Sequence, residues 1–372
     1  MLDYSSIKKL GFGLMRLPMT GDKVDIPQTK EMVDLFMEKG FTYFDTAYGY
    51  IDGKSEEAVK EALVSRYPRD SFQLATKLPA FSVSTEAEAK AMLQTSLNRT
   101  GAEYFDFYLL HNLSPERRKN FDDFGIWDFA LEQKEKGIIK HLGFSMHASA
   151  EFLDEILNEH PEMEFVQLQI NYADWESSLL QARLCYEVAV KHGKPIIIME
   201  PVKGGLLAAL PQKAADVLKA ADPDASLASW AIRYAASLDN VITVLSGMST
   251  IEQMQDNLSY MESFKPLTKE EYACIEKVQG ILASVPQVPC TDCKYCVKDC
   301  PQNIAIPGIF KVYNDYLQYD NLDMVKGSYG WETNKNGKAK DCIACGLCES
   351  VCPQSIHIID ELAKASAVFD IG

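Results

Sequence analysis

Eight of the ten cysteines fall into two copies of one pattern, Cys-x2-Cys-x2-Cys-x3-Cys-Pro. This spacing is typical of chains that hold two 4Fe-4S clusters, because three close thiolates cover three corners of a cube and the fourth ligand comes from the other run. Each cluster carries one electron at a time. The sequence therefore predicts one cluster on Cys290, Cys293, Cys296 and Cys352, and a second on Cys342, Cys345, Cys348 and Cys300.

The two copies agree beyond their cysteines. Cys-Pro-Gln-Asn-Ile-Ala-Ile after Cys300 corresponds to Cys-Pro-Gln-Ser-Ile-His-Ile after Cys352, so two halves related by a local two-fold axis are expected. This segment resembles the bacterial two-cluster ferredoxins, which implies a small α+β module. Zinc ribbons and disulfides are the alternatives for such cysteines.

Size and charge narrow the classes of partner. A chain of 372 residues with 47% hydrophobic content is expected to form one large core and a small appendage. A formal net charge of −16 disfavours nucleic acid and anionic membranes as partners. No apolar run reaches the length of a membrane span, and no secretion signal opens the chain, so a cytoplasmic location is expected.

Short apolar runs alternate with amphipathic helical stretches up to about Tyr260, a pattern typical of a parallel sheet with helical crossovers. The count favours a closed (β/α)8 barrel over a doubly wound sheet, because no dinucleotide-type glycine run follows the first strand. The predicted strands are Leu10–Leu14, Thr42–Asp45, Gln73–Thr76, Phe105–Leu110, Ile138–Gly143, Phe165–Gln169, Pro195–Met199 and Val241–Leu245.

A helix is predicted over Thr268–Ala283, and Pro286 and Pro289 interrupt the pattern after it. The domain boundary is accordingly placed between residues 284 and 285, with the barrel in 1–284 and the cluster module in 285–372. Between the two cysteine runs, aromatic residues recur every three positions from Phe310 to Tyr319. This helical spacing predicts that they pack against the barrel or the clusters.

Four ionisable residues stand where predicted strands end. Asp45 closes one strand, Tyr50 follows it by five residues, Lys77 follows the next strand and His111 the one after. The carboxyl ends of barrel strands meet at one face, where barrel enzymes carry their chemistry. The sequence therefore predicts that these side chains surround one cavity.

Residues 5 to 262 resemble the aldo-keto reductase family. The resemblance is carried by Asp45-Thr46-Ala47-x-x-Tyr50, the strand-terminal Lys77 and the segment Asp106-x-Tyr108-Leu109-x-His111. It implies that Tyr50 donates a proton to a carbonyl oxygen while a reduced nicotinamide supplies hydride. Lys77 would lower the pKa of the phenol, Asp45 would hold Lys77, and His111 would position the carbonyl.

The same resemblance implies a binding site for NADH or NADPH. Ser145 and Gln167 match positions that hold the nicotinamide carboxamide, and the Gly-Gly-Leu run matches the loop over the pyrophosphate. Met146, Met199 and Gly247 depart from the family pattern, in which an amide, an aromatic ring and a cation are usual. The cofactor contacts implied are Ser145, Gln167, Gly204, Gly205, Leu206, Ser249, Gln253 and Asn257.

Three functions are compatible with these features. The favoured one is nicotinamide-dependent reduction of a small-molecule carbonyl, or the reverse oxidation of an alcohol, with an appended electron-transfer module and a one-electron redox partner protein. The second is an iron–sulfur enzyme that uses a flavin or another acceptor in the barrel, because clusters move single electrons whereas a nicotinamide moves two. The third is a redox sensor with a silent barrel.

Overall fold

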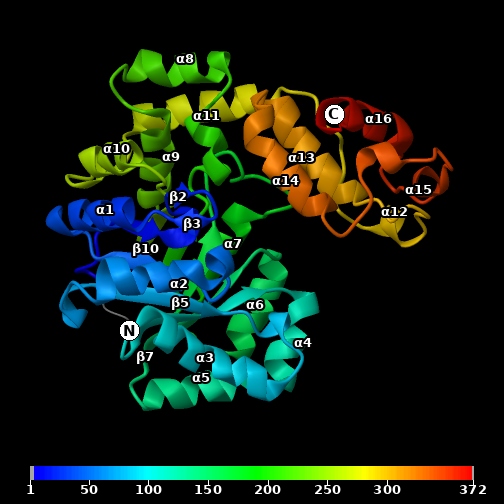
Figure 1. Cartoon of the computed structure of the whole chain (residues 1–372). Helices are drawn as coiled ribbons and strands as arrows, with labels where there is room; N and C mark the ends of the chain where they lie inside the picture. The colour runs from blue at the N-terminus through cyan, green and yellow to red at the C-terminus, as the bar shows by residue number, and fades with distance from the viewer. Residues whose placement is uncertain (1–3, 371–372) are drawn as a thin grey trace. The chain divides into compact units, whose positions relative to one another are not determined.

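Eight parallel strands close into a barrel in the first part of the chain (Figure 1). The barrel closes because β1 pairs with both β4 and β10, with Phe12 opposite Phe44 and Leu10 opposite Val244. All eight predicted strands are confirmed, and the doubly wound sheet is excluded. The strands are β1 (Leu10–Gly13), β4 (Tyr43–Asp45), β5 (Gln73–Leu78), β6 (Phe105–Leu113), β7 (Ile139–Met146), β8 (Phe165–Gln169), β9 (Ile196–Met199) and β10 (Val241–Ser246).

The structure is a computed structural model in which residues 4–370 are described. It divides into two compact units, one up to residue 203 together with 228–268, and one of 204–227 together with 269 onward. The boundary at 284/285 drawn from the sequence stays a prediction, since the compact units divide at other residues. Within the described residues, no helix is both long and apolar enough to cross a membrane.

Helices cover the outside of the barrel, and their ends follow local sequence signals. Asp25 caps the first helix, which has a proline in its first turn, while Thr85 and Glu88 form a capping box. A hairpin of β2 (Met19–Thr20) and β3 (Lys23–Val24) precedes them. The helices are α1 (Ile26–Glu38), α2 (Lys54–Val59), α3 (Glu86–Thr100), α4 (Pro115–Asp123), α5 (Ile126–Glu135), α6 (Ala150–Glu159), α7 (Ala182–Lys191), α9 (Leu227–Ala236) and α10 (Ile251–Met261).

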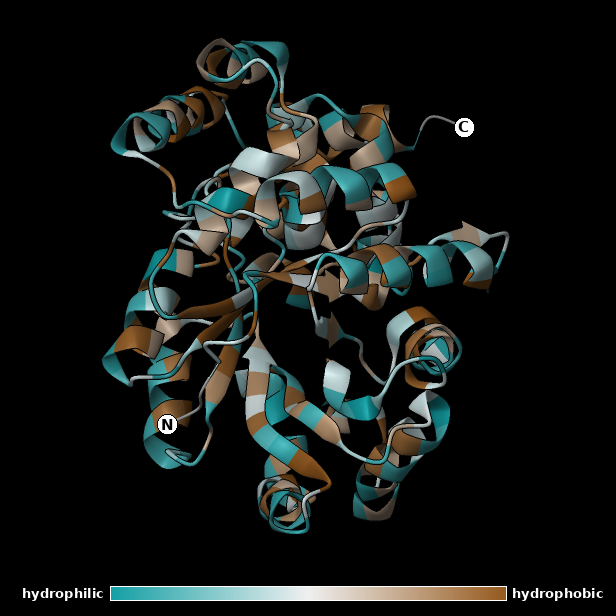
Figure 2. Ribbon diagram, turned by 90° about the vertical axis from the view of Figure 1, so that its left-hand side faces the viewer, coloured by the Kyte–Doolittle hydropathy of each residue, from teal (hydrophilic) through white to brown (hydrophobic). Residues whose placement is uncertain are grey.

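Alternate strand residues fill two hydrophobic layers. Tyr43, Phe107 and Phe165 point into the barrel, where neighbouring ring centroids lie 5.0 and 5.2 Å apart. Phe44 faces outward and meets Phe36 of α1 at 5.3 Å. Each such buried side chain contributes about 1.5–3 kcal/mol of transfer free energy. Figure 2 shows the strands as largely hydrophobic and the helices as two-toned, as burial on one side requires.

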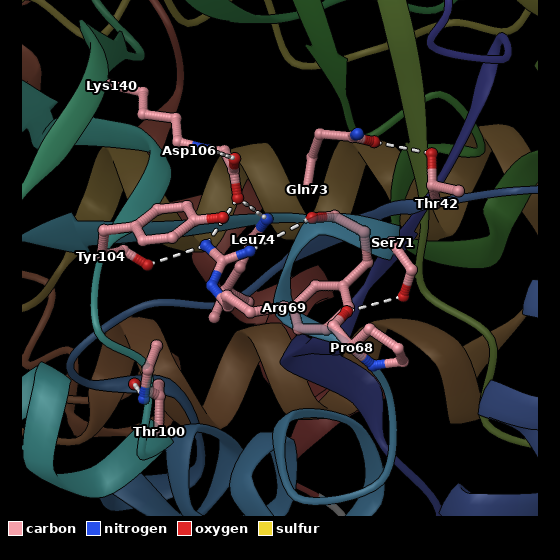
Figure 3. Close-up of polar contacts among 12 residues, drawn as sticks. Thr42, Pro68, Arg69, Ser71, Gln73, Leu74, Thr100, Tyr104, Asp106 and Lys140 are labelled. Atoms are coloured by element: carbon pink, nitrogen blue, oxygen red, sulfur yellow. Dashed lines mark hydrogen bonds and ion pairs between the residues drawn. The ribbon is translucent and has the colours of Figure 1, made fainter.

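A polar cluster holds the strands together where they begin. The carboxylate of Asp106 accepts hydrogen bonds from Arg69 at 2.6 Å, the backbone N–H of Leu74 at 3.0 Å and Lys140 at 3.1 Å (Figure 3). Arg69 also donates to the backbone carbonyl of Tyr104 at 2.7 Å. These residues stand at the amino-terminal ends of β5, β6 and β7, opposite the end where barrel chemistry occurs, so their role is stability.

The second unit is helical. Helix α8 (Gln212–Ala221) packs against α11 (Lys269–Ala283), which confirms the helix predicted there (Figure 1). Among its described residues, the β part of the predicted α+β module is confined to one isolated bridge between Ile304 and Gly337. The other helices are α12 (Tyr295–Lys298), α13 (Ile306–Tyr319), α14 (Leu322–Thr333), α15 (Leu347–Ser350) and α16 (Ile358–Phe369).

The two cysteine runs have the same local structure. Helix α12 follows its first cysteine at the same offset as α15 follows Cys342, and α12 contacts α15. The backbone repeats as well, because Asn303 and Ser355 both have positive φ, 49° and 51°. Longer helices, α13 and α16, then begin at equivalent isoleucines and pack together. The internal repeat in the sequence is therefore also a structural repeat.

Candidate active site and cluster sites

The structure brings Asp45, Tyr50, Lys77 and His111 together at the carboxyl ends of three neighbouring strands. Asp45 ends β4, Lys77 lies near the end of β5, and His111 lies in β6. β5 pairs with β4 on one side and with β6 on the other, which makes the three strands neighbours in the barrel. Tyr50 reaches the same place from a short 3-10 turn, Tyr50–Gly53, that follows β4.

Lys77 connects Asp45 to Tyr50. Its ammonium donates to Asp45 Oδ1 at 2.5 Å, to the backbone carbonyl of Thr46 at 2.7 Å and to the hydroxyl of Tyr50 at 3.1 Å. The ammonium also lies 4.6 Å from the centre of the Tyr50 ring. The side chain of Lys77 is 1% exposed, so solvent screens these contacts little.

The electrostatics of Tyr50 differ in one respect from the prediction. Burial raises the pKa of Tyr50 above that of a free phenol, and the charge of Lys77 offsets only part of that rise. The lysine acts in the predicted direction, but desolvation of the phenolate is the larger effect on the pKa of Tyr50. Tyr50 is therefore fully protonated at neutral pH, as a proton donor must be.

Lys77 and Asp45 form a buried ion pair. Burial favours the neutral amine, yet the charge of Asp45 and the contacts of the ammonium with Asp45 and Tyr50 outweigh burial and raise the pKa of Lys77. Burial raises the pKa of Asp45, and the charge of Lys77 opposes that rise. Asp45 Oδ2 is buried and has no hydrogen-bond partner among the described residues. The carboxylate of Asp45 therefore bonds to Lys77 through Oδ1, and among the described residues its side chain has no other partner.

His111 faces Tyr50 edge-on, with the ring centres 6.1 Å apart. Burial, followed by the positive charge of Lys77, holds the pKa of His111 well below its ordinary value. Its imidazole is therefore neutral at pH 7, and its buried Nδ1 has no partner among the described residues. A neutral imidazole suits a group that donates a hydrogen bond to a carbonyl oxygen without adding charge to the site.

Sequence reasoning missed several groups at this rim. Asn112, directly after His111, adopts a left-handed φ of 56°, and its N–H donates to Ser145 Oγ at 2.9 Å. Phe81 lies 6.4 Å from the His111 ring, and the guanidinium of Arg117 stacks on Phe81 at 4.3 Å. Asparagine tolerates positive φ better than most residues, so its place after a strand-end histidine was the available signal.

Ser145 and Gln167 are direct neighbours across β7 and β8, as the prediction requires. Both are buried. The Gln167 amide nitrogen donates to the sulfur of Met199 at 3.6 Å, while its amide oxygen is buried with no partner among the described residues. A buried acceptor without a donor is costly, so this oxygen suits the NH2 group of a carboxamide.

The residues matched to the adenosine end are engaged with one another. Ser249 N–H donates to Gln253 Oε1 at 2.8 Å, and Asn257 donates to Ser246 at 2.7 Å while accepting from Tyr260 at 2.6 Å. These contacts tie helix α10 to the end of β10. An unpredicted cation lies beside them, since the aliphatic part of Arg16 packs 3.4 Å from where a β-carbon at Gly247 would stand.

Gly204, Gly205 and Leu206 belong to the second compact unit, whereas the other predicted cofactor residues belong to the first. Gly204 and Gly205 both have positive φ, 65° and 107°. A β-carbon on Gly205 would stand 2.5 Å from the methyl carbon of Met324. The requirement for glycine here follows from backbone conformation and from packing against α14, so it is not by itself a signal for phosphate.

Each predicted set of four cysteines lines one cavity. Cys290, Cys293, Cys296 and Cys352 share a cavity with Phe310, and Cys300, Cys342, Cys345 and Cys348 share another with Ile304. The remaining lining is mostly apolar, with Gln302 as the polar side chain in the second cavity and Thr291, Lys294 and Gln354 in the first. Within the described residues no three His, Cys, Asp or Glu side chains are arranged as ligands of a single ion. A four-iron cube presents four separate corners, so its thiolates need not converge on one point.

The aromatic residues predicted to pack against the barrel or the clusters divide: Phe310 lies at a cluster cavity, whereas Tyr313 and Tyr316 pack on another helix of the same unit. Phe310 is buried against the cavity of the first cysteine set. Tyr313 stacks near Tyr316, and both rings pack on Phe369 of α16 at 6.4 and 6.1 Å. Of the cysteines outside the two runs, Cys185 is buried and Cys274 is partly exposed.

Known proteins similar to this chain agree with the architecture. An aldo-keto reductase from Mycolicibacterium vanbaalenii is 28% identical over 67% of this chain and 82% of its own length. An uncharacterized oxidoreductase, YqkF, from Bacillus subtilis is 25% identical over 73% of this chain and 92% of its own. The holo form of aldo-keto reductase AKR11C1 from Bacillus halodurans has a TM-score of 0.59 at 26% identity, covering 73% of this chain and 92% of that one.

An aldo-keto reductase from Klebsiella pneumoniae, solved in complex with NADPH, shares the fold with a TM-score of 0.60 at 18% identity. It covers 73% of this chain and 91% of its own. The model of the aldo/keto reductase family matches residues 9–279, and that of a 4Fe-4S dicluster domain matches residues 289–357. The chain therefore belongs to the aldo/keto reductase family and carries a 4Fe-4S dicluster domain, with two 4Fe-4S clusters as cofactors, after its barrel residues.

Proposed function

We propose that the barrel reduces the carbonyl group of a small molecule, or oxidises the corresponding alcohol, with a nicotinamide cofactor. The observation that carries this proposal is the contact of the Lys77 ammonium with the hydroxyl of Tyr50 at 3.1 Å, beside a neutral His111. A phenol in contact with a buried cation is a proton donor whose anion is stabilised as it forms. Membership of the aldo/keto reductase family supports the same chemistry.

A reduced nicotinamide bound beside Tyr50 would supply the hydride that the carbonyl carbon accepts. Tyr50 gives its hydroxyl proton to the carbonyl oxygen, so that C=O becomes CH–OH. Lys77 stabilises the phenolate left on Tyr50, and Asp45 keeps Lys77 charged and in place. His111 hydrogen-bonds the carbonyl oxygen and opposes its developing charge. Solvent then returns a proton to Tyr50.

The residues near the end of β7 and β8 fit a nicotinamide carboxamide. Gln167 offers a buried amide oxygen that lacks a donor, and Ser145 offers a hydroxyl next to it. Met199 supplies a polarisable thioether beside Gln167, where an aromatic ring is usual in the family. We assign these three side chains to the nicotinamide, and Ser249, Gln253 and Asn257 to the neighbourhood of the adenosine.

We propose NADPH rather than NADH, on the position of Arg16. Its side chain lies against Gly247. At this position the family usually has a cationic residue, and this chain has glycine. A guanidinium there can form a charge-assisted hydrogen bond to a 2′-phosphate. Arg16→Gln is expected to raise the KM for NADPH about tenfold or more while changing the KM for NADH less. Equal effects on both cofactors would contradict this assignment.

We further propose that the two clusters have crossed ligands and exchange single electrons with a redox partner protein. Each cavity is lined by three cysteines of one run and the last cysteine of the other, which supports the crossed assignment. An anaerobic titration of iron-replete protein with NADPH, following cluster absorbance, tests whether the barrel cofactor reduces the clusters. Bleaching would show that the two sites exchange electrons.

The reductase proposal is tested with Tyr50→Phe. Reduction of an aldehyde such as 4-nitrobenzaldehyde by NADPH is expected to fall by about 100-fold or more, because the proton donor is lost. Binding of NADPH, measured by its fluorescence, should stay within about twofold. Retention of wild-type turnover by Tyr50→Phe would exclude this mechanism.

A further inference from the structure

Arg117, the third residue of helix α4, is held at the rim of the barrel beside the proposed proton-transfer group. Its guanidinium stacks 4.3 Å from the centre of the Phe81 ring, and Phe81 in turn lies 6.4 Å from the ring of His111. One of its nitrogens, Nη1, lies 3.4 Å from the backbone carbonyl of Asn112, the residue directly after His111. These contacts fix the cation next to the place where the carbonyl would bind.

The guanidinium of Arg117 has N–H groups available for a ligand. Arginine carries five N–H groups in a planar fork, and the hydrogen bond to Asn112 uses one of them. No ion pair joins Arg117 to a carboxylate among residues 4–370, and the side chain is only partly exposed. Its neighbour Arg118 differs, since it forms ion pairs with Asp122, Glu155 and Glu159. Of these two adjacent arginines on one helix, the unpaired one is the one at the rim.

The net negative charge of the protein makes the unpaired cation of Arg117 important for binding an anion. The chain has a formal net charge of −16, so an anionic small molecule is repelled at long range. The rim itself contains Glu200, whose negative charge raises the pKa of Tyr50 and which forms no ion pair with Arg117 within the described part of the chain. An anionic substrate therefore needs a local cation, and a fork of free N–H groups matches the two oxygens of a carboxylate or phosphate.

We propose that Arg117 is an oxyanion subsite, and that the substrate is an aldehyde or ketone that also bears a carboxylate or phosphate group. This inference rests on the proposed reductase function and specifies its substrate class. The carbonyl binds at Tyr50 and His111, and the anionic group binds further out at Arg117, with Phe81 between them as an apolar wall. Arg117 acts in binding and specificity and takes no part in proton transfer.

The test compares matched pairs of substrates in the iron-replete protein with NADPH. The pairs are 4-carboxybenzaldehyde with methyl 4-formylbenzoate, and D-glyceraldehyde 3-phosphate with D-glyceraldehyde. The wild-type protein should favour the anionic member of at least one pair in kcat/KM, and the preferred pair identifies carboxylate or phosphate. Arg117→Gln should reduce that preference by about 10- to 100-fold, mainly through KM, and Arg117→Lys should reduce it less.

Arg118→Gln is the control, because it removes the adjacent cation without touching the rim, and it should leave the preference unchanged. High salt should weaken the wild-type preference, because it screens the attraction. Equal activity of the wild-type protein on both members of each pair, or an equal loss on both in Arg117→Gln, would overturn the subsite.

A binding measurement separates this proposal from the reductase function. 4-Hydroxymethylbenzoate, the product of one anionic substrate, should bind the wild-type protein with NADP+ at least about tenfold more tightly than it binds Arg117→Gln. If that difference appears but no aldehyde is reduced, the subsite stands and the proposed reaction fails. If aldehydes are reduced and the difference is absent, the subsite alone fails.

Discussion

The ammonium of Lys77 lies 3.1 Å from the hydroxyl oxygen of Tyr50 and 4.6 Å from the centre of its ring. The cation is thus placed to stabilise negative charge on both the oxygen and the ring of a phenolate. Because Lys77 is almost completely buried, this stabilisation is stronger than the same contact would be in water. Tyr50 keeps its hydroxyl proton until the oxygen of a substrate accepts it.

Removing the cation should therefore abolish most activity. Lys77→Met is expected to lower kcat for aldehyde reduction by about 100-fold or more, with a smaller effect on NADPH binding. The single variant leaves Asp45 as an unpaired buried carboxylate, so the double variant Asp45→Asn/Lys77→Met is the control for folding. Stopped-flow measurement of NADPH oxidation checks the prediction, and a double variant with more than a tenth of wild-type kcat would contradict it.

The pH dependence follows from the shifted groups. Since the pKa of His111 is held well below 6.5, no acidic limb from this histidine is expected in kcat/KM near pH 6.5. Since the pKa of Tyr50 is raised above 10.0, the loss of its proton should reduce reduction rates only at strongly alkaline pH. A profile with a break near pH 6.5 that disappears in His111→Gln would show that the imidazole titrates after all.

The polar cluster at the opposite end of the barrel predicts a loss of stability without a loss of chemistry. Asp106→Ala leaves Arg69 and the Leu74 N–H without their shared acceptor. The free energy of unfolding should fall by about 3 kcal/mol, as for other broken buried ion pairs. Lys140→Met removes a half-exposed partner of the same carboxylate. It should lower the free energy of unfolding by less than about 1 kcal/mol. Urea unfolding followed by tryptophan fluorescence measures both.

Glu164 should make stability depend on pH in the acid range. Burial raises its pKa, but hydrogen bonds from His141, Lys134 and the Leu142 N–H outweigh burial and lower the pKa from 4.5 to about 2. A carboxyl group with a lower pKa in the folded state contributes stability above about pH 4.5, and that contribution is lost as the pH falls toward 2. After allowance for solvent screening the effect is roughly 1 kcal/mol.

The check for Glu164 is a comparison of variants under matched conditions. Glu164→Gln should unfold at lower urea concentration than the wild-type protein at pH 6, and the gap should narrow as the pH is lowered to 3.5. Glu151→Gln, at an exposed position on α6, is the matched control and should follow the wild-type curve. A gap that does not change with pH would mean that the carboxylate charge is unimportant.

Crossed cluster ligation makes a prediction that two double variants decide. If Cys290 and Cys352 bind the same cluster, Cys290→Ser/Cys352→Ser should damage that cluster alone and retain about four of eight iron atoms. Cys290→Ser/Cys300→Ser should then damage both clusters. Iron and sulfide analysis of anaerobically purified proteins gives the answer, and the reverse pattern would show that each run binds its own cluster.

Much of this architecture was predictable because its signals are local. Each barrel strand is a short apolar run, and the residues at the ends of β4, β5 and β6 point to one face by the geometry of any parallel barrel. The cysteine spacing is likewise local. These features are sufficient to predict the closed barrel, the group around Lys77 and the two sets of cysteines.

The rest depends on contacts between residues far apart in the chain. The net pKa shift of Tyr50 depends on how deeply the ring is buried, which spacing along the chain does not reveal. The partnership of Arg117 with Phe81 and the packing of Met324 against Gly205 join segments with no common motif. Ser249 and Asn257 match a cofactor motif by position, yet their side chains are already bonded within the protein.

The exchange of the last cysteine between the two runs has a consequence for how this tail can be lost. On the crossed assignment, a stop codon or a protease cut anywhere between Cys300 and Cys342 removes ligands from both cubes at once. Such a truncation cannot leave a protein with one intact cluster. Truncation within this segment therefore takes ligands from both iron centres, whereas substitution of cysteines from one set affects that set's cluster alone.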